Sequence, residues 1–131
     1  MANDVSRTFS RLAEFVNHNP ALIRRGRYFS DCFLIGVADT PIHVTAARGS
    51  ITEVKVGEVL MRSWRFSIRA DAYIWRRFWE PIPAPGFNDL LALARFQRVK
   101  IEGDLQPLMA NLRYIKEVLE SPRCTERQPN L

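Results

Sequence analysis

The residues with the most evident capacity for chemistry form an aromatic segment near the middle of the chain. At helical spacing Trp75 and Trp79 share one face of this segment, and Phe78 lies on an adjoining face. Such a stripe is compatible with a packed core and equally with the wall of an apolar cavity. Two features favour the cavity. The apolar surface exceeds what a short helix needs, and a stiff proline-rich loop at 81–86 can hold helices away from a sheet.

Apolar side chains from several elements are predicted to line this cavity and to bind a lipid-like ligand. The predicted ligand-binding residues are Phe66, Ile68, Trp75, Phe78, Trp79, Phe87, Leu91, Leu108, Leu112 and Ile115. Burial of an alkyl chain contributes about 0.8 kcal/mol per methylene, against an association cost of about 4–15 kcal/mol. We therefore expect a modest affinity, which suits a carrier that has to release its ligand.

Arginines dominate the positive charge of the chain, which has 19 basic and 14 acidic residues. Arg69, Arg76 and Arg77 flank the predicted cavity and are predicted to pair with a carboxylate or phosphate head group. For any one of them, a free surface arginine is the simpler interpretation. A second basic cluster at 24–27 could contact an anionic membrane transiently, with a solvated face as the alternative.

Few residues support an enzyme. The sequence has no Gly-x-Ser-x-Gly motif, no glycine-rich phosphate loop and no metal-ligand spacing. Cys32 and His43 could act as nucleophile and base only with a third group to orient them. Asp31 or Asp71 could act as a base beside a dry cavity, although helix capping explains Asp71 more simply. The prediction is a protein with no catalytic residue, metal or cofactor. A small isomerase-like enzyme or accessory subunit acting on a hydrophobic substrate is the alternative.

Other partners and locations follow from the distribution of residue types. The aromatic residues fall on apolar stripes instead of alternating with basic residues on one exposed face, so nucleic acid is not expected as a partner. No apolar run approaches the roughly 20 residues of a membrane span, and the N-terminus lacks the core of a signal peptide. We expect a cytoplasmic protein, and the sequence leaves its oligomeric state open.

The hydrophobic pattern predicts one α+β domain. Helices are predicted at 4–17, 20–25, 71–79 and 90–96 and from 104 onward, and strands at 30–38, 42–47, 51–56, 64–70 and 98–102. Short links between strands predict a single, mostly antiparallel sheet with helices packed on one face. The domain is expected to span 1–122, followed by a flexible polar tail at 123–131.

The order of elements from Phe33 to Leu119 resembles the sterol carrier protein type 2 family. The motifs that carry the resemblance are Thr40-Pro41 at the second strand, Gly49 and Gly57 around the third, Ile68-Arg69-Ala70-Asp71 before the tryptophan helix, and Arg98-Val99-Lys100-Ile101-Glu102-Gly103-Asp104 before the last helix. The resemblance implies a five-stranded sheet covered by helices and an apolar tunnel. It also implies non-enzymatic binding or transfer of a fatty acid, fatty acyl-CoA or sterol-like ligand. Residues 79–86 depart from the family, which typically has a segment of small residues there.

Overall fold

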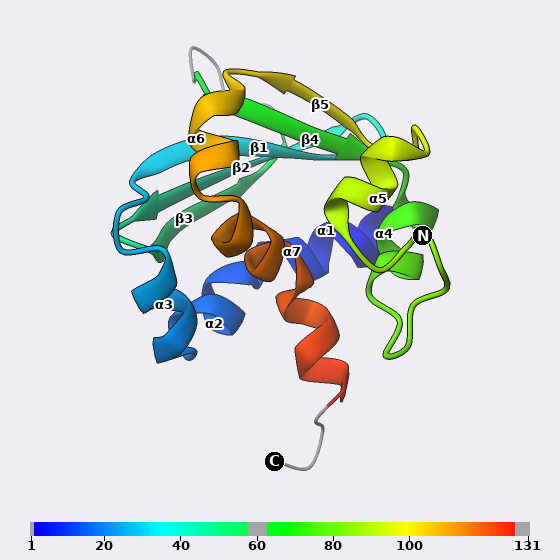
Figure 1. Cartoon of the computed structure of the whole chain (residues 1–131), viewed down its shortest axis with the longest axis horizontal. Helices are drawn as coiled ribbons and strands as arrows, with labels where there is room; N and C mark the ends of the chain where they lie inside the picture. The colour runs from blue at the N-terminus through cyan, green and yellow to red at the C-terminus, as the bar shows by residue number, and fades with distance from the viewer. Residues whose placement is uncertain (1, 58–62, 128–131) are drawn as a thin grey trace.

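Seven helices and five strands make up the described part of the chain. The computed structural model describes residues 2–57 and 63–127. The helices are α1 (Ala2–Ser10), α2 (Leu12–Asn17), α3 (Pro20–Arg25), α4 (Ala72–Phe78), α5 (Leu90–Arg95), α6 (Leu105–Ala110) and α7 (Leu112–Arg127). The strands are β1 (Asp31–Val37), β2 (Thr40–Ala47), β3 (Ser50–Val56), β4 (Phe66–Ala70) and β5 (Lys100–Gly103). Figure 1 shows the strands on one side of the molecule and the helices gathered below them.

The five strands form one sheet in the order β3-β2-β1-β4-β5. Neighbouring strands pair antiparallel, except that β1 and β4 run parallel. The predicted α+β class and mostly antiparallel sheet are therefore confirmed. The parallel pair escapes the sequence pattern, because β3 and β4 follow each other in the chain but lie on opposite sides of β1 and β2 in the sheet.

Alternate residues of the strands form the sheet's half of the core. Phe33 and Ile35 of β1 are fully buried and pair in register with Val44 and Ile42 of β2, which are also fully buried. Because successive side chains of a strand point to opposite faces, these four residues share one face. Helices cover that face in Figure 1, so the main core lies between sheet and helices, as predicted.

β4 departs on its outer face from the alternation of its sequence, in which apolar Phe66 and Ile68 alternate with polar residues. Phe66 and Ile68 are fully buried, as expected, but Ser67 is fully buried as well, where the pattern predicts contact with solvent. Ser67 pairs in register with Leu34 on one side and Glu102 on the other. A small side chain between two larger neighbours is covered by them, so the prediction of a wet face is wrong at this position.

The N-terminal amphipathic pattern forms two helices instead of one. Its apolar residues are buried as predicted: Val5, Phe9, Leu12 and Val16. A turn at Arg11 separates α1 from α2. The side chain of Asn19 then caps α3 by accepting a hydrogen bond from the main-chain nitrogen of Leu22 at 3.2 Å, as a residue before Pro20 can.

The glycine between β5 and α6 allows these elements to meet β4. Gly103 has a φ of +100°, and a Cβ placed on it would lie 2.5 Å from the main-chain oxygen of Arg65. A larger residue would therefore be both strained and in collision with the chain before β4. The main-chain nitrogen of Asp104 donates to that same Arg65 oxygen at 2.7 Å, which closes the junction.

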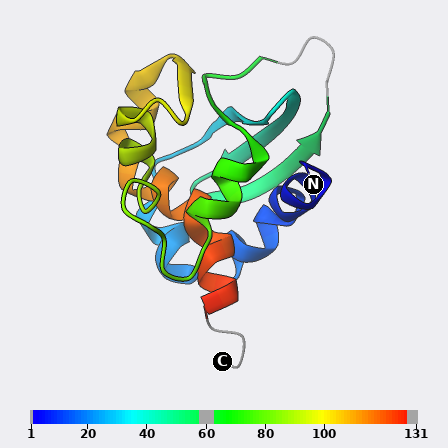
Figure 2. The same ribbon diagram turned by 90° about the vertical axis from the view of Figure 1, so that its right-hand side faces the viewer.

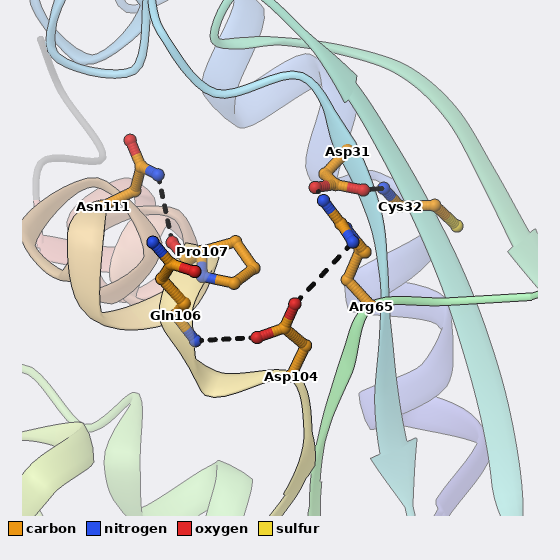
Figure 3. Close-up of polar contacts among 7 residues, drawn as sticks. All are labelled: Asp31, Cys32, Arg65, Asp104, Gln106, Pro107 and Asn111. Atoms are coloured by element: carbon orange, nitrogen blue, oxygen red, sulfur yellow. Dashed lines mark hydrogen bonds and ion pairs between the residues drawn. The ribbon is translucent and has the colours of Figure 1, made fainter.

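Side chains complete this junction, as Figure 3 shows. Nε of Arg65 lies 3.0 Å from Oδ2 of Asp31 on β1, and Nη1 lies 3.7 Å from Oδ2 of Asp104. The other carboxylate oxygen of Asp104 caps α6 by accepting from the main-chain nitrogen of Gln106 at 3.1 Å. The strand-Gly-Asp-helix motif in the sequence therefore joins β5 to α6 covalently, and its polar contacts through Arg65 connect this junction to β1 and β4.

The C-terminal helical region forms two helices where one was predicted. The pattern predicts one helix from 104 onward, but the chain turns at Asn111 and forms α6 and α7. The turn leaves Leu105 and Met109 exposed, whereas Leu108 and Ile115 are buried.

The last helix also continues beyond Pro122, the residue at which the predicted domain ends. Proline has no N–H to donate, which would leave the oxygen of Val118 without its usual helical partner. The hydroxyl of Ser121 donates to that oxygen at 2.7 Å instead. α7 therefore ends at Arg127, and the predicted tail at 123–131 begins inside it; residues 128–131 lie outside the described part.

Candidate functional site

Hydrogen bonds fix Trp75 of α4 and Trp79, the residue after it, to the main chain of other elements. Nε1 of Trp75 donates to the oxygen of Gly36 on β1 at 3.1 Å, and Nε1 of Trp79 donates to that of Leu119 on α7 at 2.8 Å. Both indoles are buried. A buried indole with a satisfied N–H has little freedom to move, so these side chains form a rigid wall.

Two aromatic clusters fill the layer between sheet and helices. In the first, the ring of Phe9 on α1 lies 5.1 Å from Trp75 and 4.9 Å from Trp79, both edge to face. Phe78 joins it at 6.0 Å from Trp75. These distances are typical of favourable aromatic pairs, and they hold α1 against α4.

The second cluster lies at the β1–β4 pair. Phe33 and Phe66 stack with ring centroids 5.2 Å apart, and Phe29 lies 6.1 Å from Phe33. Tyr114 of α7 packs 5.6 Å from Phe29, and its hydroxyl donates to the main-chain oxygen of Gly49 at 2.7 Å. Burial raises the pKa of Tyr114, so the hydroxyl keeps its proton and remains a donor.

The predicted ligand-binding residues lie mostly in this layer. Those that are buried are Phe66, Ile68, Trp75, Phe78, Trp79, Phe87, Leu108 and Ile115. Leu112 is partly buried against them. Leu91 is 42% exposed, because α5 turns Leu90 and Leu93 toward the core instead.

Residues 80–96, here called the α5 segment, lie at the edge of this layer. Figures 1 and 2 show its loop and short helix on the helical side of the sheet, beside α4. Leu90 and Leu93 anchor α5, and Phe87, Ala84 and Ala94 of the same segment also pack against the core. Nζ of Lys116 on α7 pairs with Oδ1 of Asp89 at 2.6 Å. Local opening of a fold costs least at short elements at its edge, and α5 is such an element.

A pocket of about 480 Å³ opens where β4 ends and β5 begins. These two strand ends lie at the right-hand side of Figure 1. Its lining comes from the turn after β1, the end of β4, α5 and the start of β5: Ala38, Arg69, Ala70, Asp71, Ala94, Gln97, Arg98, Val99 and Lys100. Three of these residues are basic and one is acidic. None of the predicted ligand-binding residues lines it, so this polar pocket is distinct from the apolar layer.

The structure separates the three predicted head-group arginines. Arg69 lines the polar pocket, and Arg76 and Arg77 do not. Nε of Arg77 donates to Glu80 at 2.8 Å and Nη1 donates to the hydroxyl of Tyr73 at 2.8 Å. These hydrogen bonds raise the pKa of Arg77 and commit its donors to neighbouring side chains.

The second predicted basic cluster surrounds a shallow hollow of about 310 Å³ lined by Ala21, Arg24, Arg25 and Arg27. Arg25 forms an ion pair with Glu117 on α7. The guanidinium of Arg27 lies 4.7 Å from the ring centroid of Tyr28, which is 82% exposed. An exposed aromatic ring beside arginines therefore marks this surface.

The residues that the sequence suggested for catalysis are not brought together in the structure. Cys32 pairs in register with Thr45, and His43 with Leu34, so Cys32 and His43 lie on a diagonal, roughly 7–8 Å apart. Asp31 is paired with Arg65. Asp71 is exposed and occupies the N-cap position of α4, as predicted, but its side chain makes no cap hydrogen bond. Within residues 2–57 and 63–127, no three His, Cys, Asp or Glu side chains are placed to hold a metal ion.

Sequence reasoning missed several residues of the aromatic layer and of the polar pocket. Phe29 and Tyr114 lie outside the regular stripes, so their periodicity gives no signal. A Cβ placed on Gly26 would lie 2.3 Å from the ring of Tyr114, which links a helix-ending glycine to an aromatic residue far away in the chain. Arg98 lies before β5, and its contacts with the α5 segment depend on the fold.

Comparison with known proteins supports the fold through structure alone. No family model matches the chain, and no curated protein matches its sequence. A crystal structure of sterol carrier protein 2 matches with a TM-score of 0.69 at 15% identity, over 90% of this chain and 92% of that one.

Two further structures agree. A conserved hypothetical protein from Thermus thermophilus, described as a candidate sterol carrier protein, matches with a TM-score of 0.60 at 12% identity, over 88% of this chain and 86% of its own. UbiJ-SCP2, described as a ubiquinone synthesis protein, matches with a TM-score of 0.59 at 17% identity and 92% coverage of both chains. In the described ranges, moreover, no helix has the length and apolar character to cross a bilayer. The mixed five-stranded sheet and the helices on its one face give this chain the fold of sterol carrier protein 2.

Proposed function

We propose that the protein is a non-enzymatic carrier that binds a lipid-like ligand between its sheet and its helices. The observation that carries the proposal is the aromatic layer: tryptophans fixed to β1 and α7 on one side, and the α5 segment, with its short helix, at the edge. The likeness to sterol carrier protein 2 across about 90% of the chain supports the same conclusion. The ligand would be a fatty acid, fatty acyl-CoA or sterol-like molecule.

Ligand entry would require displacement of the α5 segment, because the predicted ligand-binding residues are packed together between sheet and helices. Opening breaks the ion pair between Lys116 and Asp89 and exposes Leu90 and Leu93. An alkyl chain of roughly 14 methylenes supplies about 11 kcal/mol gross on burial, which offsets this cost. The tryptophans stay in place as the fixed wall, and Phe87, Leu108 and Ile115 move against the ligand.

A carrier also needs a surface from which to collect its ligand. Arg24, Arg27 and the exposed ring of Tyr28 form one exposed patch with this character. Arginines near an anionic bilayer contribute about 1 kcal/mol each, and an amphipathic ring favours the interface. We propose a transient membrane contact through this patch.

A second function in the same class is presentation of a hydrophobic substrate to an enzyme. UbiJ-SCP2, which shares the fold over 92% of both chains, is described as a ubiquinone synthesis protein. In that role the ligand would be an intermediate of a biosynthetic reaction, and the protein would be an accessory subunit. The identity of the co-purified ligand separates the two functions: a membrane lipid supports the carrier, and a prenylated aromatic molecule supports the accessory role.

Native mass spectrometry of the freshly purified chain tests the proposal. We expect a population heavier than the polypeptide by the mass of one lipid, which is released on denaturation. In a second measurement, cis-parinaric acid should quench tryptophan fluorescence saturably at one equivalent, because Trp75 and Trp79 border the site.

Two substitutions on α6 give a matched comparison. Leu108→Phe fills the layer and should weaken parinarate binding at least tenfold, whereas Leu105→Phe changes an exposed position and should leave it unchanged. Thermal melting of both variants confirms that each is folded. An unliganded mass alone, together with no saturable quenching, contradicts the carrier proposal.

A further inference from the structure

Arg98 is oriented by aromatic rings instead of by a carboxylate. Its guanidinium carbon lies 4.1 Å from the ring centroid of Phe87 and 5.2 Å from that of Phe96. Its Nη1 donates to the main-chain oxygen of Gly86 at 3.2 Å. Cation–π contacts and a carbonyl hold the group in place but leave its charge unneutralised. A guanidinium has five N–H donors, so several remain available to a ligand in the pocket.

Two glycines leave the space that the pocket arginines occupy. A Cβ placed on Gly36 would lie 2.4 Å from Cγ of Arg69, and one placed on Gly86 would lie 2.6 Å from Nη1 of Arg98. The stem of Arg69 and the guanidinium of Arg98 therefore lie against the main chain at these glycines, which restricts their freedom. Restricted side chains lose less entropy when they bind a ligand, which favours affinity.

The charge of the pocket is unbalanced. Arg69, Arg98 and Lys100 line it together with one carboxylate, Asp71. Among the described residues no carboxylate lies within ion-pair distance of Arg69 or Arg98, whereas Lys100 lies 3.6 Å from Glu102 on a well-exposed edge. The pocket thus concentrates positive charge that the fold itself does not pair.

We propose that the pocket between Arg69 and Arg98 binds a phosphate-class oxyanion. The forked donors of two arginines match the several oxygens of such a group, which a single ammonium would contact only as a point charge. The basic side chains that line this open pocket suit a charged group. This site goes beyond the proposed carrier function, because it binds an oxyanion whether the group is free or ends a lipid.

Titration of the full chain with inorganic phosphate, followed by NMR of the arginine Nε–Hε and backbone amide signals, tests the site. We expect saturable shifts at Arg98 and Arg69 and at the amides of Gln97 and Val99. Arg98→Gln and Arg69→Gln should each weaken binding at least tenfold. Asp71→Asn should tighten it several-fold, because it removes the opposing charge.

The matched control is Arg95→Gln, which removes the same charge from an exposed residue of α5 outside the pocket and should leave binding unchanged. If loss of the Arg98 packing unfolds the chain, Arg69→Gln carries the test. Shifts that do not saturate, or that are equal in Arg69→Gln and Arg95→Gln, mean an adventitious ion only and overturn the site.

The source of the oxyanion is distinguished with dihexanoylphosphatidic acid, a soluble short-chain lipid. Binding at least tenfold tighter than phosphate, with the same dependence on Arg69, identifies a lipid head group; equal affinity identifies free phosphate. Both results support the site. Phosphate binding in a chain that binds no cis-parinaric acid would contradict the carrier function while leaving this site intact.

Discussion

The main-chain oxygen of Gly36 accepts a hydrogen bond from Nε1 of Trp75 at 3.1 Å, on the central strand β1. The same residue pairs in register with Arg69 of β4, whose stem occupies the space where a side chain would be. One glycine therefore connects both proposed sites. Its oxygen holds the wall of the apolar layer, and its missing side chain admits an arginine of the oxyanion pocket.

Replacement of Trp75 should show that it is a packed structural wall. Trp75→Ala should lower the free energy of unfolding by about 3–5 kcal/mol, because it removes a fully buried indole and its hydrogen bond to the oxygen of Gly36. Tyr73→Ala, on the exposed side of the same helix, should cost far less. Urea denaturation measures both. A loss under about 1 kcal/mol for Trp75→Ala would mean that the indole borders empty space and is not a packed wall.

Alanine substitutions at two glycines with nearly equal φ angles distinguish backbone strain from steric collision. Gly103→Ala should destabilise the fold by more than Gly57→Ala, because both have φ near +100° but only Gly103 faces the oxygen of Arg65. A Cβ on Gly57 meets nothing within 4 Å, so that variant reports backbone strain of about 1–3 kcal/mol. Equal midpoints in urea for the two variants would refute the role assigned to the β5–α6 junction.

Loosening the α5 segment should speed ligand release. Lys116→Met removes the ion pair with Asp89 while keeping the apolar stem, so the segment should open more often. We expect the dissociation rate of cis-parinaric acid to rise several-fold in stopped-flow measurements. Lys55→Met, at an exposed pair with Glu53, is the control and should leave the rate unchanged. An unchanged rate in Lys116→Met would indicate another route of entry.

The carboxyl of Glu120 should make the fold less stable as pH rises through its titration. Partial burial raises the pKa of Glu120. The charge of Arg123, whose Nη1 lies 3.5 Å from Oε1 of Glu120, lowers this pKa but has the smaller effect. A carboxyl with a raised pKa takes up a proton on folding, so the free energy of unfolding falls between the unfolded value, about 4.3, and the folded pKa. Above the folded pKa the full loss of stability is present.

Glu120→Gln cannot ionise, so its stability profile should lack this step. It should also be more stable than the unmodified chain at neutral pH, because the amide can still accept from Arg123. Glu14→Gln, at an exposed position of α2, should reproduce the original profile. Parallel profiles for Glu120→Gln and the unmodified chain, measured by urea denaturation at several pH values, would rule out a buried carboxyl at this position.

Local patterns in the sequence predicted most of the fold. The continuous apolar run of β1, the alternation in β2 and β4, the cap at Asn19 and the Gly103-Asp104 motif each act through neighbouring residues, so the sequence shows them directly. The parallel β1–β4 pair and the turns at Arg11 and Asn111 depend on tertiary packing. Pro122 stays inside α7 because a serine hydroxyl replaces the missing donor, which no proline rule anticipates.

The candidate site was less accessible to prediction. Helical spacing correctly grouped Trp75 with Trp79, but spacing cannot show that each indole reaches a main-chain oxygen on another element. It also could not distinguish Arg69, which lines the pocket, from Arg77, which is bound to Glu80 and Tyr73. The orientation of the Arg98 guanidinium depends on two aromatic rings from the α5 segment, and only the three-dimensional structure shows these contacts.

The most direct measurement of the carrier proposal is NMR with a fatty acid that bears a nitroxide on its alkyl chain. If the chain enters the layer between sheet and helices, methyl signals of Leu108 and Ile115, both buried, should broaden at one equivalent. The signal of Met109, which is 56% exposed on the same helix as Leu108, should persist. Broadening of Met109 and other surface methyl groups, with Leu108 and Ile115 unaffected, would place the lipid outside the fold and contradict the account.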